Sequence, residues 1–347
     1  FVDNSGGVDC SDHEVNIKIL LDVVQRRTKQ TRAERNRLLA RMTDEVGQLV
    51  LRDNYLQSQA ISLMQSVAAE RLGEHAHLIR SLELEGVLDR ALEWAAELGL
   101  RVVLDLHAAP GCQNGFDNGG IKDVCEWHTQ EEYLAHSVDV LGRLASRYRA
   151  MPSLHAIEVL NEPRWDVPTA LLETYYRRGY DAIRAHCRPD RVAVVFHDGF
   201  RPHGEFTRLF RESPFENVIF DVHRYQCFSR EDLDMDIHGH LHKAGVSWRA
   251  EAAAIQSELG VPAICGEWSL GLDLKVVSLW APGPYNHALE YMDGFQEDVA
   301  LRAYAAAQLL AFEHYRGWFF WSYRTETTPA WCFRDCVARG WLPPRFQ

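Results

Sequence analysis

Two glutamates stand at the ends of apolar segments that are typical of buried strands. Glu162 ends the segment Ile157–Glu162 and precedes Pro163, and Glu267 directly follows the segment Pro262–Gly266. Enzymes built as α/β barrels place their reactive groups at the carboxyl ends of parallel strands. Two carboxyl groups that face one pocket can cleave a glycosidic bond, because one protonates the leaving oxygen while the other meets the developing oxocarbenium ion. The two glutamates therefore predict a catalytic pair.

A polar, glycine-rich loop follows the apolar segment Leu104–Leu106. It begins at His107, runs to Gly120 and contains Phe116 and Asp117. The loop offers many hydrogen-bond donors and acceptors, but it has no cluster of positive charge and no helix-opening phosphate fingerprint. This composition predicts recognition of a neutral polyol rather than a nucleotide, with His107 as a substrate contact.

The segment Asp221–Phe228 repeats this design. His223 and Tyr225 are alternate residues, so they share one face of a strand end. Both side chains can hydrogen-bond a nucleophilic carboxylate or a sugar hydroxyl, and Phe228 offers a ring face. We expect all three to contact the substrate or the reacting groups.

Two further side chains complete the candidate site. Asn161 stands beside Glu162 and can hold a sugar hydroxyl, and Trp321 can stack under a sugar ring. For the neighbouring Trp318 and Phe320 we prefer ordinary core packing.

The histidines 238, 240 and 242 alternate and would share a face if they lay on a strand, which permits a metal site. A loop of solvated histidines is the commoner arrangement, so we expect neither a metal nor a cofactor. Ser269 and Ser322 lie in no nucleophile elbow, which argues against a serine hydrolase.

Composition excludes several classes of protein. The chain has 347 residues, a formal net charge of −12 and 46% apolar residues, which suits a globular protein with a sizeable core. An acidic chain is a poor partner for nucleic acid or an anionic membrane. No apolar run approaches the roughly 18 residues of a membrane span, and no secretory signal is visible. The eight cysteines form no CxxC pairs and lack the dense spacing of a disulfide scaffold, so cysteine usage favours a reducing, cytoplasmic compartment. Cys332 and Cys336 are one helical turn apart, which permits a disulfide bond, although two free thiols are the commoner arrangement.

Residues 1–85 carry almost no strand signal. A capping box at Ser11–Glu14 predicts a helix over Val15–Val24. Helical spacing predicts two more over Thr31–Leu51 and Tyr55–Leu84. We therefore expect an all-helical segment. Val15–Val24 or Gly47–Arg52 could alternatively be recruited as strands.

Residues 86–347 alternate strands with helices, which predicts a parallel α/β sheet. The sequence contains six strand candidates, whereas a closed (β/α)8 barrel has eight. The strands are expected at Arg101–His107, His155–Leu160, Val192–Phe196, Val218–His223, Val261–Gly266 and Gly317–Ser322, and the helices at Val87–Gly99, Glu131–Ala150, Ala170–His186, Trp248–Leu259 and Val299–Tyr315.

Residues from about 88 to 347 resemble glycoside hydrolase family 5, in particular its exo-β-1,3-glucanase branch. The motifs that carry the resemblance occur in the family's order, at Leu104–Gly120, Asn161–Pro163, His223–Phe228, Gly266–Ser269 and Gly317–Glu326. The resemblance implies a (β/α)8 barrel and retaining hydrolysis of β-glucosidic bonds. It makes Glu162 the acid/base and Glu267 the nucleophile. It also implies that the sugar is surrounded by His107, Phe116, Asp117, Asn161, His223, Tyr225, Phe228 and Trp321.

Residues 1 to about 93 are similar to the large NAD-specific glutamate dehydrogenases, through Phe1–Leu20 and Arg52–Tyr55 with the helix that follows. The two resemblances overlap at Leu88–Glu93. A splice at this hexapeptide is our hypothesis for the origin of the chain, and the same junction in an intact genomic reading frame would contradict it. The dehydrogenase-like part has no dinucleotide turn and no catalytic-lysine segment, so we expect no dehydrogenase activity.

The hydrolase-like part lacks the family's first two strands. It therefore also lacks the second-strand arginine that braces the nucleophile in the family and an early glutamate that binds sugar. We therefore expect a family 5 site on an incomplete, six-stranded barrel with two exposed strand edges, acting on β-1,3-glucan with reduced or absent turnover. One alternative is a catalytically dead module that still binds β-glucan. Another is a dehydrogenase-derived helical segment that binds dehydrogenase subunits.

Overall fold

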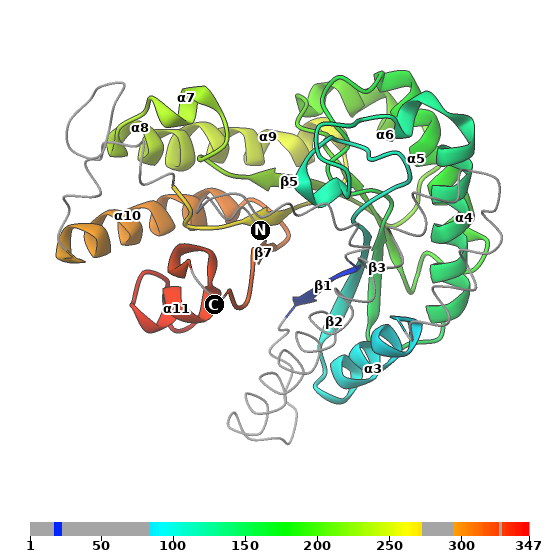
Figure 1. Ribbon diagram of the computed structural model, residues 1–347, viewed down its shortest axis with the longest axis horizontal. Coiled ribbons are helices and arrows are strands. Elements are labelled where there is room, and N and C mark those ends of the chain that lie inside the picture. Colours follow the sequence, from blue (N-terminus) through cyan, green and yellow to red (C-terminus); the bar gives the residue numbers. More distant parts are fainter. Residues whose placement is uncertain (1–16, 23–83, 273–293, 326–327, 347) are drawn as a thin grey trace. The chain divides into compact units, whose positions relative to one another are not determined.

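The computed structural model describes residues 17–22, 84–272, 294–325 and 328–346 (Figure 1). The chain divides into two compact units, residues 1–197 and 198–347. The predicted helix Thr31–Leu51 lies outside the described residues, as do the strand alternative Gly47–Arg52 and all but the last residue of the predicted helix Tyr55–Leu84.

The described part of the first unit contains three parallel strands. β2 (Arg101–Leu106), β3 (Leu154–Glu158) and β4 (Ala193–His197) are neighbours in chain order, with Val103 opposite Ala156 and Ile157 opposite Val194. Almost every residue of these strands is buried, as the near-continuous apolar segments require for strands covered on both faces. The predicted strands Arg101–His107, His155–Leu160 and Val192–Phe196 are therefore confirmed.

One helix packs on each of these strands. α3 (Leu84–Glu97) contacts β2, α4 (Glu131–Tyr148) contacts β3, and α5 (Thr169–Arg184) contacts β4 (Figure 1). α5 also packs along α4 at Gly179, where a Cβ atom would lie 3.1 Å from both Leu141 Cδ1 and Val159 Cγ1. The absence of a side chain at this position allows the close approach. The helices predicted at Val87–Gly99, Glu131–Ala150 and Ala170–His186 are confirmed.

The first described segment is a strand where the capping box predicts a helix. β1 (Ile17–Asp22) runs antiparallel to β2, from Ile17 opposite Leu106 to Asp22 opposite Arg101. The helix prediction for Val15–Val24 is therefore wrong, and recruitment as a strand is what the structure shows. The edge of β2 offers a row of backbone donors and acceptors, and pairing with that row outweighs a local helix signal.

The described part of the second unit also contains three parallel strands. They are β5 (Val218–Arg224), β6 (Ala263–Trp268) and β7 (Trp318–Phe320). Phe220 lies opposite Ala263, and the register shifts by one residue after Val222, so that His223 lies opposite Glu267. This shift occurs at the strand ends that carry the candidate site residues. The predicted strands Val218–His223, Val261–Gly266 and Gly317–Ser322 are confirmed, although β7 is shorter than predicted.

Two long helices pack in the second unit. α9 (Arg249–Leu259) contacts β6, and α10 (Gly294–Phe312) contacts α9. α9 lies within the predicted helix Trp248–Leu259, and α10 overlaps the predicted helix Val299–Tyr315 but begins five residues earlier. Shorter helices join these elements, at α6 (Thr207–Glu212), α7 (Arg230–Leu233), α8 (Ile237–His242), the π-helical turn η4 (Lys243–Trp248) and α11 (Phe333–Ala338).

The histidine-rich segment is helix α8, so the expected loop at this position is wrong. Asp236 caps the helix by accepting a hydrogen bond from the backbone N–H of Gly239 at 2.8 Å. His240 is buried with its Nδ1 2.7 Å from Gln226 Oε1, whereas His238 and His242 are exposed. The three histidines therefore do not lie on one face of a strand, which is the arrangement that the metal alternative assumed.

Among the described residues the structure thus has an α/β fold with six parallel strands, three in each unit, as expected for an incomplete (β/α)8 barrel. The prediction of two free sheet edges is wrong for β2, because β1 pairs with it. β7 pairs with β6, and among the described residues no strand pairs with its other edge.

No helix in the described parts of the chain is long and apolar enough to span a membrane. The seven described cysteines, Cys332 and Cys336 among them, are free thiols.

Candidate active site

Glu162 lies on the turn that follows β3. The backbone N–H of Asn161 donates to the carbonyl of Leu106 at 3.0 Å, which joins this turn to the end of β2. Glu162 then adopts a φ of 44°, a left-handed conformation that is uncommon for a residue with a side chain. Its side chain is 5% exposed and faces the loop after β2. Backbone strain of this kind is frequent at sites that must aim a reactive group.

Asn118 holds the Glu162 carboxylate. Its amide Nδ2 donates a hydrogen bond of 2.6 Å to Glu162 Oε2, and its Oδ1 accepts from Asn114 Nδ2 at 3.0 Å. Asn114 Oδ1 in turn accepts from the backbone N–H of Phe116. The glycine-rich loop therefore positions the carboxylate through a chain of amide side chains.

Gln113 ties this loop to two strand ends. Its Nε2 donates to the carbonyl oxygens of His107 and Asn161 at 2.8 and 2.9 Å, and its Oε1 accepts from the N–H of Ala109. Gln113 is fully buried, so all of its hydrogen bonds are formed away from water. The side chain therefore fixes the spacing between the segment of Glu162 and the segment of His107.

His107 and Asn161 are two further buried polar residues at strand ends of the first unit. His107 Nδ1 lies 2.7 Å from Asp105 Oδ2, which orients the imidazole ring. Asn161 is fully buried, and neither its Nδ2 nor its Oδ1 forms a hydrogen bond to any described residue. A buried amide without partners is costly, so it is suited to a polar ligand that supplies the missing hydrogen bonds.

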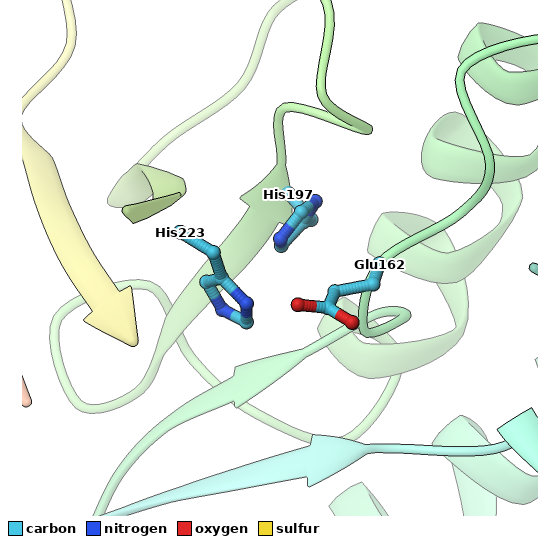
Figure 2. A group of neighbouring side chains, drawn as sticks. All are labelled: Glu162, His197 and His223. Carbon is cyan, nitrogen blue, oxygen red and sulfur yellow. The ribbon is translucent and has the colours of Figure 1, made fainter. Parts of the chain in front are cut away.

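His197 belongs to the same site, although the sequence analysis did not select it. Figure 2 shows its ring beside Glu162, at the carboxyl ends of β4 and β3, and a ring nitrogen lies within 4.8 Å of a Glu162 carboxylate oxygen. Its carbonyl accepts a hydrogen bond from the hydroxyl of Tyr176 at 2.6 Å. The sequence does carry a signal for His197 as a site residue, because it directly follows the predicted strand Val192–Phe196, just as His107 follows β2.

Glu267 lies near the end of β6 in the second unit and is 4% exposed. The hydroxyl of Tyr225 donates a hydrogen bond of 2.7 Å to Glu267 Oε2, and His223 Nδ1 lies 3.8 Å from the same oxygen. Figure 2 also shows His223, at the end of β5. His223 and Tyr225 therefore share a face at the strand end, as predicted, and both side chains lie close to the carboxylate of Glu267.

The residue before Glu267 is fixed by Asp221. Asp221 Oδ1 accepts a hydrogen bond from the N–H of Gly266 at 2.6 Å, and its Oδ2 lies 3.5 Å from His223 Nε2. A Cβ atom on Gly266 would lie only 1.9 Å from Asp221 Oδ2, so a glycine is required for this approach. The carboxylate of Asp221 thus joins β5 to β6 beside the candidate nucleophile.

A buried charge cluster lies beside these strand ends in the second unit. Burial raises the pKa of Asp198 to about 7, although the Arg224 guanidinium and the N–H of Phe200 both lower it. Burial lowers the pKa of Arg224, but the neighbouring Tyr315, Glu251 and Asp198 raise it more, and the net direction is upward. Arg224 Nη2 forms an ion pair with Glu251 Oε2 at 3.0 Å.

Aromatic side chains surround Tyr225. The ring of Phe228 lies 5.4 Å from it in a T-shaped pair, and the Phe228 side chain is 65% exposed. The ring of Trp331, which was not among the predicted site residues, stacks on that of Tyr225 with the centroids 5.2 Å apart, and it also lies 6.1 Å from the ring of Phe228. Trp321 directly follows β7 and donates its backbone N–H to the carbonyl of Trp268.

Two further predicted substrate contacts lie in the loop after β2. Phe116 is half-buried with its ring 6.1 Å from the exposed Trp165, and Asp117 is exposed with Oδ1 3.5 Å from Lys122 Nζ. Trp318 and Phe320 pack on Trp268 with ring centroids 5.1 and 5.0 Å away, which agrees with the preference for core packing.

Parallel strands alternating with helices, with carboxylates, histidines and aromatic rings at the strands' carboxyl ends, define the class of (β/α)8-barrel proteins. Within that class the chain belongs to glycosyl hydrolase family 5, because the sequence model of that family, described as Cellulase, matches residues 81–322. A second model, the catalytic domain of bacterial NAD-glutamate dehydrogenase, matches residues 1–64. Both predicted resemblances are therefore confirmed.

Individual relatives agree with this assignment. The chain is 35% identical over 278 residues to a probable glucan 1,3-beta-glucosidase A of Aspergillus fumigatus, covering 74% of this chain and 64% of that protein. It is 30% identical over 275 residues to a glucan 1,3-beta-glucosidase of Blumeria graminis, with the same coverage. The chain therefore spans less than two thirds of the length of these relatives.

Solved structures show the same fold. The crystal structure of AoRut superposes with a TM-score of 0.58 at 19% identity, covering 74% of this chain and 71% of that one. A rutinosidase from Aspergillus niger gives a TM-score of 0.55 at 16% identity, covering 76% and 72%.

Proposed function

We propose that this chain hydrolyses β-glucosidic bonds, with β-1,3-glucan as its substrate and release of terminal glucose, by a retaining double displacement. The named activity of the relatives supports the reaction and the substrate class. The observation that carries the proposal is the pair of buried glutamates at strand ends, each held by a hydrogen bond from a neutral donor, Asn118 for Glu162 and Tyr225 for Glu267. Such donors orient a carboxylate without neutralising it.

In the first step, Glu162 donates its proton to the glycosidic oxygen and the bond from that oxygen to the anomeric carbon breaks. Glu267 forms a new bond to the anomeric carbon, which gives a covalent glycosyl-enzyme. The hydroxyl of Tyr225 occupies Oε2 of Glu267, so it holds the carboxylate in one orientation for attack.

In the second step, Glu162 takes a proton from water, and the water oxygen attacks the anomeric carbon and displaces Glu267. The two inversions restore the original configuration. The buried amide of Asn161, which has no partner among the described residues, is suited to bind a sugar hydroxyl beside Glu162 throughout both steps.

The experiment measures release of the phenol from an aryl β-glucoside and the anomeric form of the product. Glu162→Ala should slow both steps but leave substrates with good leaving groups partly competent, and azide should rescue turnover with retained configuration. Glu267→Ala should abolish retaining turnover. Glu132→Ala, an exposed position on α4, serves as the control and should behave like the parent. If the Glu162 and Glu267 variants both match the parent, the assignment is wrong.

A second candidate is a module that binds β-glucan without cleaving it. The exposure of Phe228 favours it, since an exposed ring can stack on a sugar independently of chemistry. Binding of laminarioligosaccharides, measured beside hydrolysis, separates the two candidates, because binding without product release supports the module and contradicts the hydrolase.

A further inference from the structure

Trp331 lies in the turn η5 (Pro329–Trp331), which is bonded to the strand exits of the second unit. Its carbonyl accepts from the N–H of Ser322 at 2.8 Å, and its own N–H donates to the carbonyl of Thr328 at 3.0 Å. The carbonyl of Ala330 accepts from the N–H of Leu270 at 3.0 Å. These bonds tie the backbone of Trp331 to the segments that follow both β6 and β7.

The indole ring of Trp331 fills the space between Gly271 and Tyr225. A Cβ atom on Gly271 would lie 2.3 Å from both Cε2 and Nε1 of the indole, so only a glycine leaves room for the ring at this point. On the other side, the rings of Trp331 and Tyr225 are stacked at 5.2 Å with an interplanar angle of 27°. The position of the indole is therefore fixed by the hydrogen bonds of its backbone and by its packing between Gly271 and Tyr225.

Tyr225 needs such a support. It follows the last residue of β5, Arg224, and so lies outside the regular strand. Phe228 also packs against Tyr225, with its ring 6.1 Å from that of Trp331, but its side chain is 65% exposed and therefore gives a less rigid boundary. The hydroxyl of Tyr225 must nevertheless stay 2.7 Å from Glu267 Oε2. A rigid ring stacked on its face restricts the two side-chain torsions that decide where the hydroxyl points.

We propose that Trp331 is a positioning residue that acts through Tyr225 on Glu267, keeping the tyrosine hydroxyl on the carboxylate of the nucleophile. This inference rests on the proposed function, because it assigns Glu267 as the nucleophile. A residue that acts through Tyr225 changes the chemical step rather than substrate binding, so the loss of Trp331 should lower kcat and leave KM nearly unchanged. The energy of an aromatic pair corresponds to a loss of about 3- to 10-fold.

The test is a double-mutant cycle on hydrolysis of an aryl β-glucoside. Trp331→Leu in the parent should lower kcat about 3- to 10-fold, with KM changed by less than about 2-fold. In a Tyr225→Phe background, where no hydroxyl remains to be oriented, Trp331→Leu should cause little further loss. Trp331→Phe keeps an aromatic ring and should retain most of the parent's kcat.

Gly271→Ala displaces the indole while both aromatic residues remain in the chain, so it should reproduce the kinetic effect of Trp331→Leu. Gly317→Ala is the matched control, since nothing lies within 4 Å of a Cβ atom at that glycine. Additive losses in the cycle, an unchanged kcat, or a raised KM alone would each overturn the inference, and the last would indicate direct contact with substrate.

Crystal structures of Trp331→Leu and Gly271→Ala give a readout that does not depend on turnover. The distance from the Tyr225 hydroxyl to Glu267 Oε2 should increase beyond hydrogen-bonding range in both variants. A hydrogen bond kept at the parent distance overturns the inference even if the chain is inactive. A parent chain that binds glucan but releases no product contradicts the proposed function alone.

Discussion

The amide nitrogen of Asn118 lies 2.6 Å from Oε2 of Glu162, and this hydrogen bond joins two residues that are 44 positions apart in the chain. It brings the glycine-rich loop after β2 to the candidate catalytic residue after β3. The carboxylate of Glu162 is thus oriented by a residue from a different strand–loop segment, and similar long-range contacts recur at Glu267.

Asn118→Ala should reduce kcat/KM for an aryl β-glucoside about 10-fold or more, because a hydrogen bond to a carboxylate contributes roughly 1.5–3 kcal/mol. Steady-state kinetics measure the loss, and thermal unfolding checks that the fold is kept. Glu126→Gln, which changes an exposed side chain shortly after this loop, is the control and should leave the rate unchanged. Equal rates for Asn118→Ala and the parent would mean that this bond does not orient Glu162.

Gly266→Ala should lower the free energy of unfolding by at least about 2 kcal/mol, because the added Cβ atom would overlap Asp221 Oδ2 and force β5 and β6 apart. Urea denaturation measures the change. Gly317→Ala, which meets nothing within 4 Å, should stay within about 1 kcal/mol of the parent. Similar midpoints for the two variants would show that the backbone of β6 adjusts freely.

Asp198 should make stability depend on pH between about 4 and 7, because burial raises its pKa to about 7 in the folded chain. The folded state binds the proton of Asp198 more tightly than the unfolded state does. The stabilisation that comes from this proton is therefore complete below pH 4 and is lost as pH rises to 7. Asp198→Asn keeps a neutral side chain at every pH. Its stability relative to the parent should therefore rise by up to about 1.4 kcal/mol per pH unit across that range.

Urea denaturation of both proteins at several pH values measures this difference. Asp234→Asn, an exposed position, is the control and should follow the parent at every pH. A difference between Asp198→Asn and the parent that is constant from pH 4 to pH 7 would contradict a raised pKa for Asp198.

Phe228→Ala should raise KM for laminarioligosaccharides about 3- to 10-fold with a smaller effect on kcat, since an exposed ring contributes stacking rather than chemistry. The comparison is with Phe295→Ala, which removes a ring that is 76% exposed on α10. Steady-state kinetics with oligosaccharides of increasing length measure the effect. Identical KM values for the two variants would remove Phe228 from the substrate site.

Much of the fold was predictable because its elements carry local signals. The strands β2 to β6 are apolar runs bounded by loop residues, and α3, α4 and α5 show helical spacing, so each could be found within a few residues. β1 could not be placed this way. Its local pattern favours a helix, and only the free edge of β2 makes it a strand.

The residues of the candidate site also fall into those that the sequence predicts and those that it does not. Glu162, Glu267, His107 and His223 were found from a single rule, that polar residues directly after buried parallel strands converge on one face of a barrel. Nothing in the sequence selects Asn118, Gln113 or Trp331, because each lies in a loop or turn and its partners are remote in the chain.

The sequence by itself determined the order of strands and helices and the positions of both glutamates at strand ends, because periodicity and strand length act over a few neighbouring residues. Only the tertiary structure decided which side chains hold those glutamates, with Asn118 on Glu162 and Tyr225 on Glu267. The physical reason is that a hydrogen bond or a ring stack requires an approach of a few ångströms, which residues far apart in the chain reach only when the strands and their loops have packed.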